Sequence, residues 1–364
     1  MEVDARVEAW ASLQLIPGLT PRALFDLLKS LGGPKQVLAA PQASLQRSVS
    51  SEVAAAIRRG PDAEQLERSL AWLALDRHWL VAWDDSDYPG LLLAIPDPPP
   101  AFGYVGRREL LNCPAVAIVG SRHATPQGIE HAEAFAVALS TAGLTIVSGL
   151  AVGIDAAAHR GGLAGAGSSI AVLGSGLDRI YPPANCDLAD RLAQAGGLLS
   201  EFPLGTPPLP ANFPRRNRVI SGLSCGVLVV EATLNSGSLI TARLAVEQGR
   251  EVFAIPGSIH SPFSKGGHRL IKDGAKLVET AQDVLEELRL SPAPEATPAE
   301  SADEKAIEGI AGRVLAALGH DPAGIDALCE RTGLVTEAVA AALMELELSG
   351  KITPLPGGAY QRLR

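Results

Sequence analysis

Short apolar runs alternate with longer amphipathic stretches between residues 84 and 290. The stretches between the runs, such as "PQGIEHAEAFAVALSTAG", have the length and periodicity of helices. Apolar runs without polar interruptions are typical of strands that are buried on both faces. We therefore expect an α/β domain with an extended Rossmann-like, doubly wound and mostly parallel sheet, which binds ligands at the carboxyl ends of its strands. The runs are "AVAIVG" (115–120), "TIVSG" (145–149), "IAVLG" (170–174), "GVLVVEA" (226–232) and "EVFAIPG" (251–257).

Residues 1–80 have the pattern of several small helices. In "LQLIPGLTPRALFDLLKS" the apolar residues recur at helical spacing, and Pro17-Gly18 interrupts them. Thr20 is placed to cap a helix that has Pro21 at its first position. The pattern fits a SAM-like or helix-hairpin-helix domain. A helix-hairpin-helix unit can hold a DNA phosphate on backbone amides, and a module that serves only for packing is the alternative.

The C-terminal part has a different composition. "SPAPEATPAESAD" (291–303) is typical of a disordered linker. Residues 304–364 predict helices followed by two short strands around Gly357-Gly358, which together suggest a winged helix. Its recognition-helix position, "VTEAVAAALMELELSG", contains three glutamates and neither lysine nor arginine. The acidic charge favours a protein contact, or none, over a contact with DNA.

Composition limits the function in several ways. The formal net charge is -9, so any claim of nucleic-acid binding must depend on local charge. The four cysteines lie far apart without zinc spacing, which predicts reduced thiols, a cytoplasmic location and no metal site. No apolar run approaches the length of a membrane span, and the start, "MEVDARVEAW", lacks the pattern of a secretory leader.

The enzyme motifs in the chain do not have the context that their chemistry requires. "GLSCG" (222–226) matches a nucleophile elbow, but it closes a helix instead of following a strand, which argues against a nucleophilic Ser224. "GSGLDR" (174–179) lacks the third glycine of a dinucleotide-binding loop. His159 fits a structural histidine better than a general base. The residues themselves predict no catalytic group and no cofactor.

Two stretches suggest phosphate binding. "VGSR" (119–122) follows the first apolar strand; Gly120 allows a close backbone approach, Ser121 supplies a hydroxyl, and Arg122 can bind phosphate oxygens with two N–H groups. "NSGSLITA" (235–242) opens a helix whose free amides could receive an anion, unless Ser236 or Ser238 caps it. A plain surface arginine is the alternative for Arg122.

The stretch "NFPRRNR" (212–218) places three arginines between two strands. If Pro214 takes the first helical position, a helix runs over 215–224 and its N-terminus lies at the ligand edge. Cations there oppose the helix dipole, so an anion between them would explain them. With the aromatic ring of Phe213, they suit single-stranded nucleic acid. The alternative is a network of ion pairs with Glu201 or Glu231.

Helix geometry separates two of these arginines. A helix turns by about 100° per residue, so Arg216 and Arg218 point about 200° apart and cannot both reach one phosphate. They could bind successive phosphates, or one of them could brace Asn217 and the neighbouring loop. Both interpretations remain open from the sequence.

Together these motifs resemble the bacterial DNA-processing protein A family (DprA, also called Smf). The matching stretches follow the expected order over most of residues 84–280. His268 departs from the family pattern, where Asn is expected, and "AHRGGL" has a second glycine where alanine is usual. The stretches are "AIVGSRHATPQG", "IVSGLAVGIDAAAHRGGL", "AVLGSGLDRIYPPAN", "LLSEFPLG", "FPRRNRVISGLS", "VLVVEATLNSGSLITARLAVEQGREVFAIPGS" and "GGHRLIKDGA".

The resemblance implies a non-catalytic protein that binds single-stranded DNA on the Rossmann-like domain (84–290), forms a homodimer through it and loads a RecA-type recombinase in natural transformation. A phosphoribohydrolase on the same fold is the alternative, but "NSGSLITA" lacks the glutamate of that enzyme motif. The residues that the resemblance assigns to DNA are Gly120, Ser121, Arg122, Phe213, Pro214, Arg216, Asn217 and Arg218, with Arg215 at a variable position and Lys265 as a weaker candidate.

Overall fold

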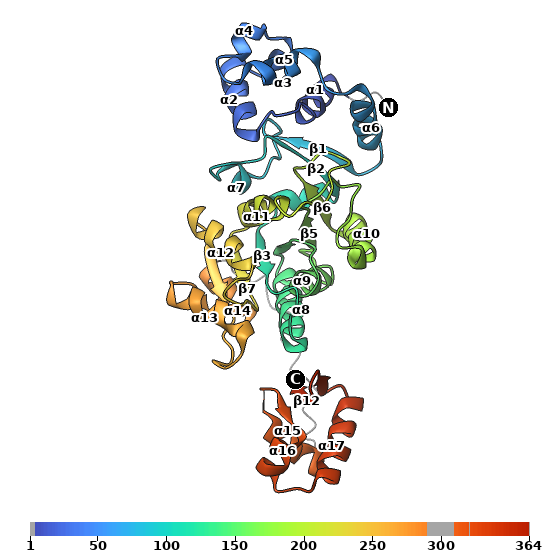
Figure 1. Ribbon diagram of the computed structural model, residues 1–364, viewed down its shortest axis with the longest axis vertical. Helices are drawn as coiled ribbons and strands as arrows, with labels where there is room; N and C mark the ends of the chain where they lie inside the picture. Colours follow the sequence, from blue (N-terminus) through green and yellow to red (C-terminus); the bar gives the residue numbers. More distant parts are fainter. Residues whose placement is uncertain (1–3, 290–308, 320, 364) are drawn as a thin grey trace.

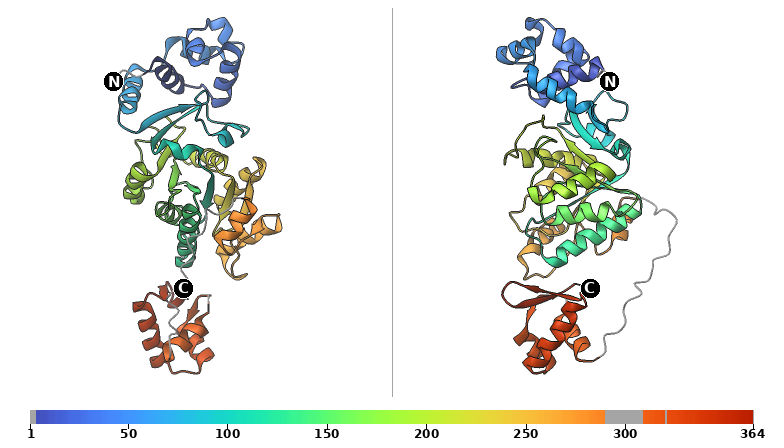
Figure 2. Two further views of the ribbon diagram at one scale, coloured as in Figure 1. Left: turned by 180° about the vertical axis from the view of Figure 1, so that it is seen from behind. Right: turned by 90° about the vertical axis from the view of Figure 1, so that its right-hand side faces the viewer.

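The computed structural model describes residues 4–289, 309–319 and 321–363. Six helices come first and gather at one end of the sheet in each view (Figures 1 and 2). Thr20 caps α2 by accepting a hydrogen bond from the amide of Ala23, with Pro21 at the first helical position as the sequence predicts. Trp10, Leu27 and Leu45 are among the buried side chains of this module. The helices are α1 (Ala5–Gln14), α2 (Pro21–Leu31), α3 (Pro34–Ala39), α4 (Gln42–Leu45), α5 (Ser51–Arg59) and α6 (Ala63–Leu73).

A nine-stranded sheet follows, in the order β1-β2-β6-β5-β4-β3-β7-β8-β9. In this spatial order, all strands between β6 and β9 run parallel to their neighbours. At the other edge, β1 pairs antiparallel with β2, and β2 pairs antiparallel with β6. The mostly parallel, doubly wound sheet that the sequence predicts is therefore confirmed. The strands are β1 (His78–Ala82), β2 (Ala101–Gly106), β3 (Ala115–Val119), β4 (Thr145–Ser148), β5 (Ser169–Val172), β6 (Gly197–Ser200), β7 (Gly226–Val229), β8 (Glu251–Ala254) and β9 (Lys276–Leu277).

Helices cover both faces of the sheet. Phe135 of α8, Ala157 of α9 and Val284 of α14 pack on one face, against alternate residues of β3 such as Ile118. Helices α7, α11 and α12 pack on the other face, and α10 lies beside β5 and β6. The helices are α7 (Gly90–Leu93), α8 (Pro126–Thr141), α9 (Ile154–Gly162), α10 (Cys186–Ala195), α11 (Asn212–Leu223), α12 (Ser238–Glu247), α13 (Lys265–Lys272) and α14 (Ala281–Glu287), with short 3₁₀ turns at Arg108–Asn112, Pro183–Asn185 and Pro262–Ser264.

The connections place a topological switch point between β3 and β7. The chain moves from β3 through β4 and β5 to β6, and α11 then returns it to β7 on the other side of β3. Ligands of doubly wound sheets bind at the carboxyl ends of the strands beside such a reversal. The fold thus directs attention to the loops after β3 and β7.

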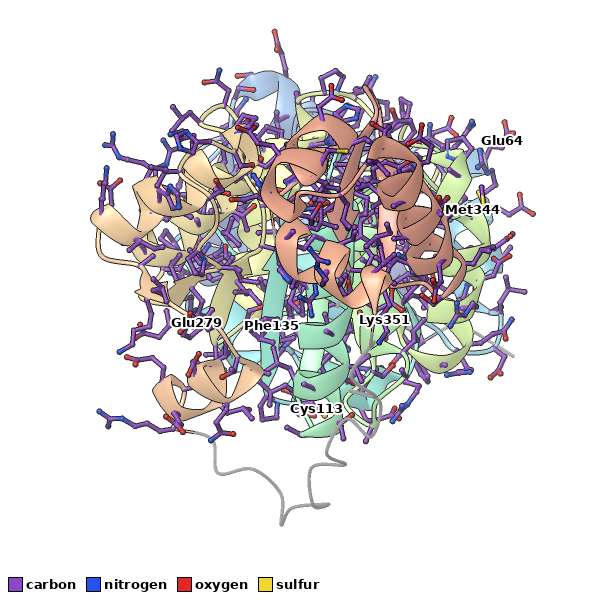
Figure 3. The ribbon with its side chains drawn as sticks, turned by 90° about the horizontal axis from the view of Figure 1, so that it is seen from below. Glu64, Cys113, Phe135, Glu279, Met344 and Lys351 are labelled. Carbon is purple, nitrogen blue, oxygen red and sulfur yellow. The ribbon has the colours of Figure 1, made fainter. Side chains whose placement is uncertain are left out.

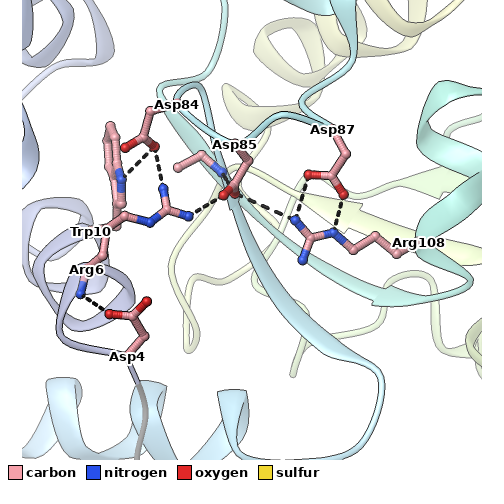
Figure 4. Close-up of polar contacts among 8 residues, drawn as sticks. Asp4, Arg6, Trp10, Asp84, Asp85, Asp87 and Arg108 are labelled. Atoms are coloured by element: carbon pink, nitrogen blue, oxygen red, sulfur yellow. Dashed lines mark hydrogen bonds and ion pairs between the residues drawn. The ribbon is translucent and has the colours of Figure 1, made fainter.

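A chain of ion pairs ties the helical module to the sheet (Figure 4). The guanidinium of Arg6 contacts Asp84 at 2.7 Å and also pairs with Asp85. The indole nitrogen of Trp10 donates to Asp84 at 3.0 Å. Residues 78–80, which we expected within the helical region, instead begin β1, so the sheet starts earlier than the sequence pattern indicated.

The C-terminal residues form a separate small domain. Its helices are α15 (Ile310–Leu318), α16 (Ile325–Thr332) and α17 (Thr336–Leu348), and β10 (Ala323–Gly324), β11 (Ile352–Leu355) and β12 (Ala359–Arg362) form its sheet. The hairpin turns at Gly357-Gly358, as predicted. Met344 of α17, labelled in Figure 3, is exposed at the periphery. The linker predicted at 291–303 lies outside the described residues.

Candidate nucleic-acid interface

A pocket of about 660 Å³ opens at the switch point. Its walls come from the turn after β3, the start of α11, and the loop that leads from β7 into α12. It therefore lies where the topology predicts a ligand. Among the residues that the sequence predicted, its lining includes Gly120, Ser121, Arg122, Phe213, Pro214, Arg216, Asn217, Ser236 and Ser238.

The turn after β3 exposes the guanidinium of Arg122. A Cβ atom on Gly120 would lie 2.6 Å from a side-chain carbon of Ile154, so only glycine fits where β3 meets the start of α9. The hydroxyl of Ser121 accepts a hydrogen bond from the amide of His123 at 3.1 Å. Arg122 is exposed, and no residue in the described part of the chain forms an ion pair or hydrogen bond with its guanidinium.

Aromatic rings lie beside this cation. The Arg122 guanidinium carbon is 5.5 Å from the centre of the Phe213 ring, and that of Arg216 is 5.9 Å from the same centre. Tyr181, which is 45% exposed, packs at an angle against Phe213 with 5.9 Å between ring centres. The edge combines cations with partly exposed aromatic rings, a combination that suits the phosphates and bases of nucleic acid.

Arg216 forms part of the pocket floor. It is only 4% exposed, and its Nη1 donates to the carbonyl of Gly149 at 2.6 Å and to that of Val172. Gly149 directly follows β4, and Val172 is the last residue of β5. The Arg216 side chain therefore joins the ends of these two strands. Its Nε atom has no hydrogen-bond partner among the described residues. The pKa of Arg216 is lowered to about 10, chiefly by burial; the charge of Asp155 opposes this fall and that of Arg122 adds to it.

Asp155 supplies the opposite charge beneath the pocket. It lies in the first turn of α9, is 7% exposed, and accepts hydrogen bonds from the amides of Gly149 at 3.1 Å and Ala151 at 3.3 Å. Burial raises the pKa of Asp155, and the nearby Arg216 opposes this rise. The two side chains thus hold the loop after β4 from both sides.

The other two arginines of "NFPRRNR" turn away from the pocket. Arg218 donates to the buried carboxylate of Glu201 at 2.5 Å, and Arg215 donates to the same oxygen at 3.0 Å. Arg218 also donates to the carbonyl of Asp97. Neither arginine lines the pocket. The geometry therefore favours the network with Glu201 that the sequence analysis left as an alternative, and not a phosphate contact, for both residues.

The remaining predicted residues divide between the pocket and its surroundings. Asn217 lines the pocket. Ser236 and Ser238 share a hydrogen bond of 2.7 Å between their hydroxyls at the start of α12, whose N-cap is Gly237 and not a serine. Lys265 lies outside the pocket lining, and its ammonium donates to the carbonyl of Ile259. Glu231 holds Thr125, the N-cap residue of α8, by accepting hydrogen bonds from its amide at 2.9 Å and from its hydroxyl at 2.6 Å.

The residues of the rejected enzyme motifs have structural roles. Ser224 is fully buried, and its hydroxyl donates to the carbonyl of Ile220. His159 is fully buried between the amide of Leu150 and the hydroxyl of Ser169, and burial lowers its pKa to about 3. Among the described residues no group of acidic, histidine or cysteine side chains could hold a metal ion.

Sequence reasoning from the residues missed Tyr181 and Asp155. Tyr181 lies in the loop "DRIYPPAN", which has no periodicity that would predict its direction. Asp155 lies two residues after Gly153 in the first turn of α9, and an acidic residue there is common because it interacts favourably with the helix dipole.

No helix in the described ranges has both the length and the apolar character of a membrane span.

The fold and the pocket define a Rossmann-like protein with a pocket at the switch point of its sheet and an appended winged helix. Comparisons with known proteins agree with this class. The family model "DNA recombination-mediator protein A" matches residues 79–289, and "DprA winged helix domain" matches 291–358. The chain belongs to the DprA/Smf family, as the sequence analysis inferred from its motifs.

Relatives support this assignment. The chain is 48% identical to Protein Smf of Escherichia coli over 307 residues, which is 83% of this chain and 82% of the relative. The X-ray structure of DprA from Streptococcus pneumoniae has a TM-score of 0.69 and 38% identity, and covers 79% of this chain and 99% of that one. A Helicobacter pylori DprA structure, described for its single-stranded DNA binding mode, has a TM-score of 0.54 and 30% identity over 60% of this chain and 98% of that one.

Proposed function

We propose that this protein binds single-stranded DNA along the pocket at the switch point, with the sugar-phosphate backbone against Arg122 and a base against the aromatic pair of Phe213 and Tyr181. The observation that carries this proposal is the guanidinium of Arg122, which has no ion-pair or hydrogen-bond partner among the described residues and lies beside an aromatic ring at the carboxyl edge of the sheet. Membership of the family and the single-stranded DNA binding mode reported for the Helicobacter pylori relative support it.

The form of DNA follows from the shape of the interface. Stacking on a half-exposed ring requires an unstacked base, which a single strand provides and a duplex does not. In the winged-helix domain, α17 has acidic Glu337, Glu345 and Glu347 and no basic residue, so it lacks the charge for the major groove. Binding is therefore expected to prefer single strands and to depend little on base sequence.

The protein acts as a binding partner and not as a catalyst in this proposal. Asp155, a carboxylate that lines the pocket, is buried and bonded to backbone amides, so it is not free to act on a substrate. The bound strand is protected and then passed to a RecA-type recombinase during natural transformation. All four cysteines are free thiols, which suits the reducing cytoplasm.

A homodimer through the Rossmann-like domain completes the proposal. Val246 of α12 is 66% exposed, and Leu277 of the edge strand β9 is 44% exposed. The open edge strand β9 can pair with a second copy of the chain, and exposed apolar side chains near it add to such a contact. The positions of these side chains support a dimer formed at that end of the sheet, away from β1.

The experiment that tests DNA binding compares single-stranded and double-stranded oligonucleotides of equal length across a salt series. We expect tighter binding of the single strand, and a fall of about 0.7 log units in affinity per log unit of salt for each neutralised phosphate. Equal affinity for both forms at every salt concentration would contradict the proposal. Release of free base from nucleoside monophosphates would favour a phosphoribohydrolase instead.

A further inference from the structure

A second groove, of about 490 Å³, lies between the helical module and the sheet domain. The loop that follows α1, with Ile16 and Pro17, forms one side, and α6 contributes Arg68. The loop after β6, with Gly205, and the loop after β5, with Arg179, form the other side. The groove thus exists only because the two domains are packed together.

The charge of this groove is positive. The guanidinium of Arg68 contacts Asp178 at 3.3 Å, but its side chain remains 55% exposed. The same aspartate also accepts a hydrogen bond from the amide of Gly205 at 2.7 Å, so it is shared between two donors. Arg179 is exposed, and nothing in the described ranges pairs with its guanidinium. No carboxylate belongs to the groove lining.

Two loops run from this groove directly to the pocket at the switch point. The loop after β5 places Arg179 in the groove and Tyr181 in the pocket, with one residue between them. The loop after β6 lines the groove with residues 203–206 and the pocket with Pro208 and Pro210. A DNA strand that left the pocket on this side would run along both loops and reach the groove next.

We propose that this groove binds the sugar-phosphate backbone of the same single-stranded DNA, beyond the nucleotides held in the pocket, with Arg179 and Arg68 as its phosphate ligands. The inference deepens the proposed function and depends on it. It gives the helical module a role: its loop after α1 and its α6 form one wall of an extended DNA path.

The lining favours backbone over bases as the ligand. Its polar side chains are arginine, glutamine and threonine, and it contains no aromatic residue on which a base could stack. Arginine is well suited to phosphate oxygens because its planar group donates two parallel hydrogen bonds. An acidic peptide could use the same arginines, and the experiment below separates the two ligands.

The test uses the full chain and oligothymidylates that increase in length from about 4 to about 16 nucleotides, the range of single-strand binding sites in other proteins. Arg179→Ala is compared with the parent and with Arg47→Ala, which removes an exposed arginine that lines neither pocket nor groove. Arg179→Ala is expected to bind the shortest oligonucleotide like the parent. For long ones it should lose about 0.7 from the salt slope, which is about fivefold in affinity at 0.1 M salt relative to 1 M.

The outcomes separate the inference from the function on which it depends. If Arg179→Ala and Arg68→Ala bind long strands with the parent's affinity and slope while Arg122→Ala is weakened, the groove is not on the DNA path and the inference is wrong. If the parent itself fails to bind single strands, the proposed function fails. A loss of affinity that is equal at every length also contradicts the inference. Binding of an acidic peptide that both variants lose, with no change in their DNA binding, would contradict the inference and identify a peptide site instead.

Discussion

Arg216 provides the sharpest test of how the pocket is built. Its guanidinium joins the carbonyls of Gly149 and Val172 and neighbours the buried carboxylate of Asp155. Arg216→Met keeps the length of the apolar stem but removes the charge and every donor. Two buried carbonyls then lose a partner, and Asp155 loses its nearby cation.

The size of the effect follows from these contacts. Removing one partner of a buried charge pair costs about 3–5 kcal/mol, because the other charge remains in a medium that solvates it poorly. For a domain of this size, about 1 kcal/mol corresponds to a change of about 2–4 °C in Tm. We therefore expect Arg216→Met to lower Tm by about 6–20 °C.

The assay is thermal unfolding followed by circular dichroism, with Arg47→Met as the control, because Arg47 is exposed and does not line the pocket. The control should melt like the parent. Below its own transition, Arg216→Met should retain the parent's salt slope in DNA binding, because a buried brace neutralises no phosphate. A variant that melts within about 2 °C of the parent yet loses salt slope would show that Arg216 contacts DNA and would refute the brace.

Three further predictions concern Phe213, the C-terminal domain and His159. Phe213→Ala should weaken single-strand binding by about 1–3 kcal/mol with nearly the same salt slope, measured by titration, because a stacked base carries no charge; a lost slope would contradict stacking. Removal of residues 291–364 should leave single-strand affinity within a few-fold of the parent in the same titration, since α17 is acidic; a loss of orders of magnitude would show that the winged helix binds DNA. His159 stays neutral in the fold, with a pKa lowered to about 3 by burial, while the unfolded imidazole takes up protons below about 6.5. The free energy of unfolding should therefore fall as pH drops from 7 to 5, by up to about 1.4 kcal/mol per unit from this group, and His159→Gln should show a smaller fall in urea titrations; an equal fall in both proteins would contradict this assignment.

The sheet could be predicted because its strands are buried on both faces. Continuous apolar runs such as "AVAIVG" have few alternatives once glycine ends them and amphipathic helices separate them. β1 was missed because "HWLVA" is only partly buried and follows helices without a turn signal. α11 begins at Asn212 and not at Pro214, since proline is tolerated throughout the first turn of a helix.

The candidate site was predictable in part. The position of the pocket follows from the strand ends and their glycines, so the turn Gly120–Arg122 that the sequence singled out lies in its lining, while its contact with phosphate stays a prediction. The direction of each arginine depends on partners that are distant in the chain. Arg218 turns to Glu201 at the end of β6, and Arg216 turns to carbonyls at the ends of β4 and β5. Helical spacing predicted that these two side chains diverge, but it could not identify which partner each would meet.

The measurement that tests the central claim most directly is the salt dependence of single-stranded DNA binding by Arg122→Ala. The account predicts weaker binding for every base sequence and a salt slope reduced by about 0.7, because one exposed guanidinium no longer neutralises a phosphate. Tm should stay close to that of the parent, since Arg122 has no ion pair or hydrogen bond with a described residue to lose and only its contact with the exposed side of the Phe213 ring disappears. Unchanged affinity and slope in a variant with the parent's Tm would place the DNA elsewhere on the molecule.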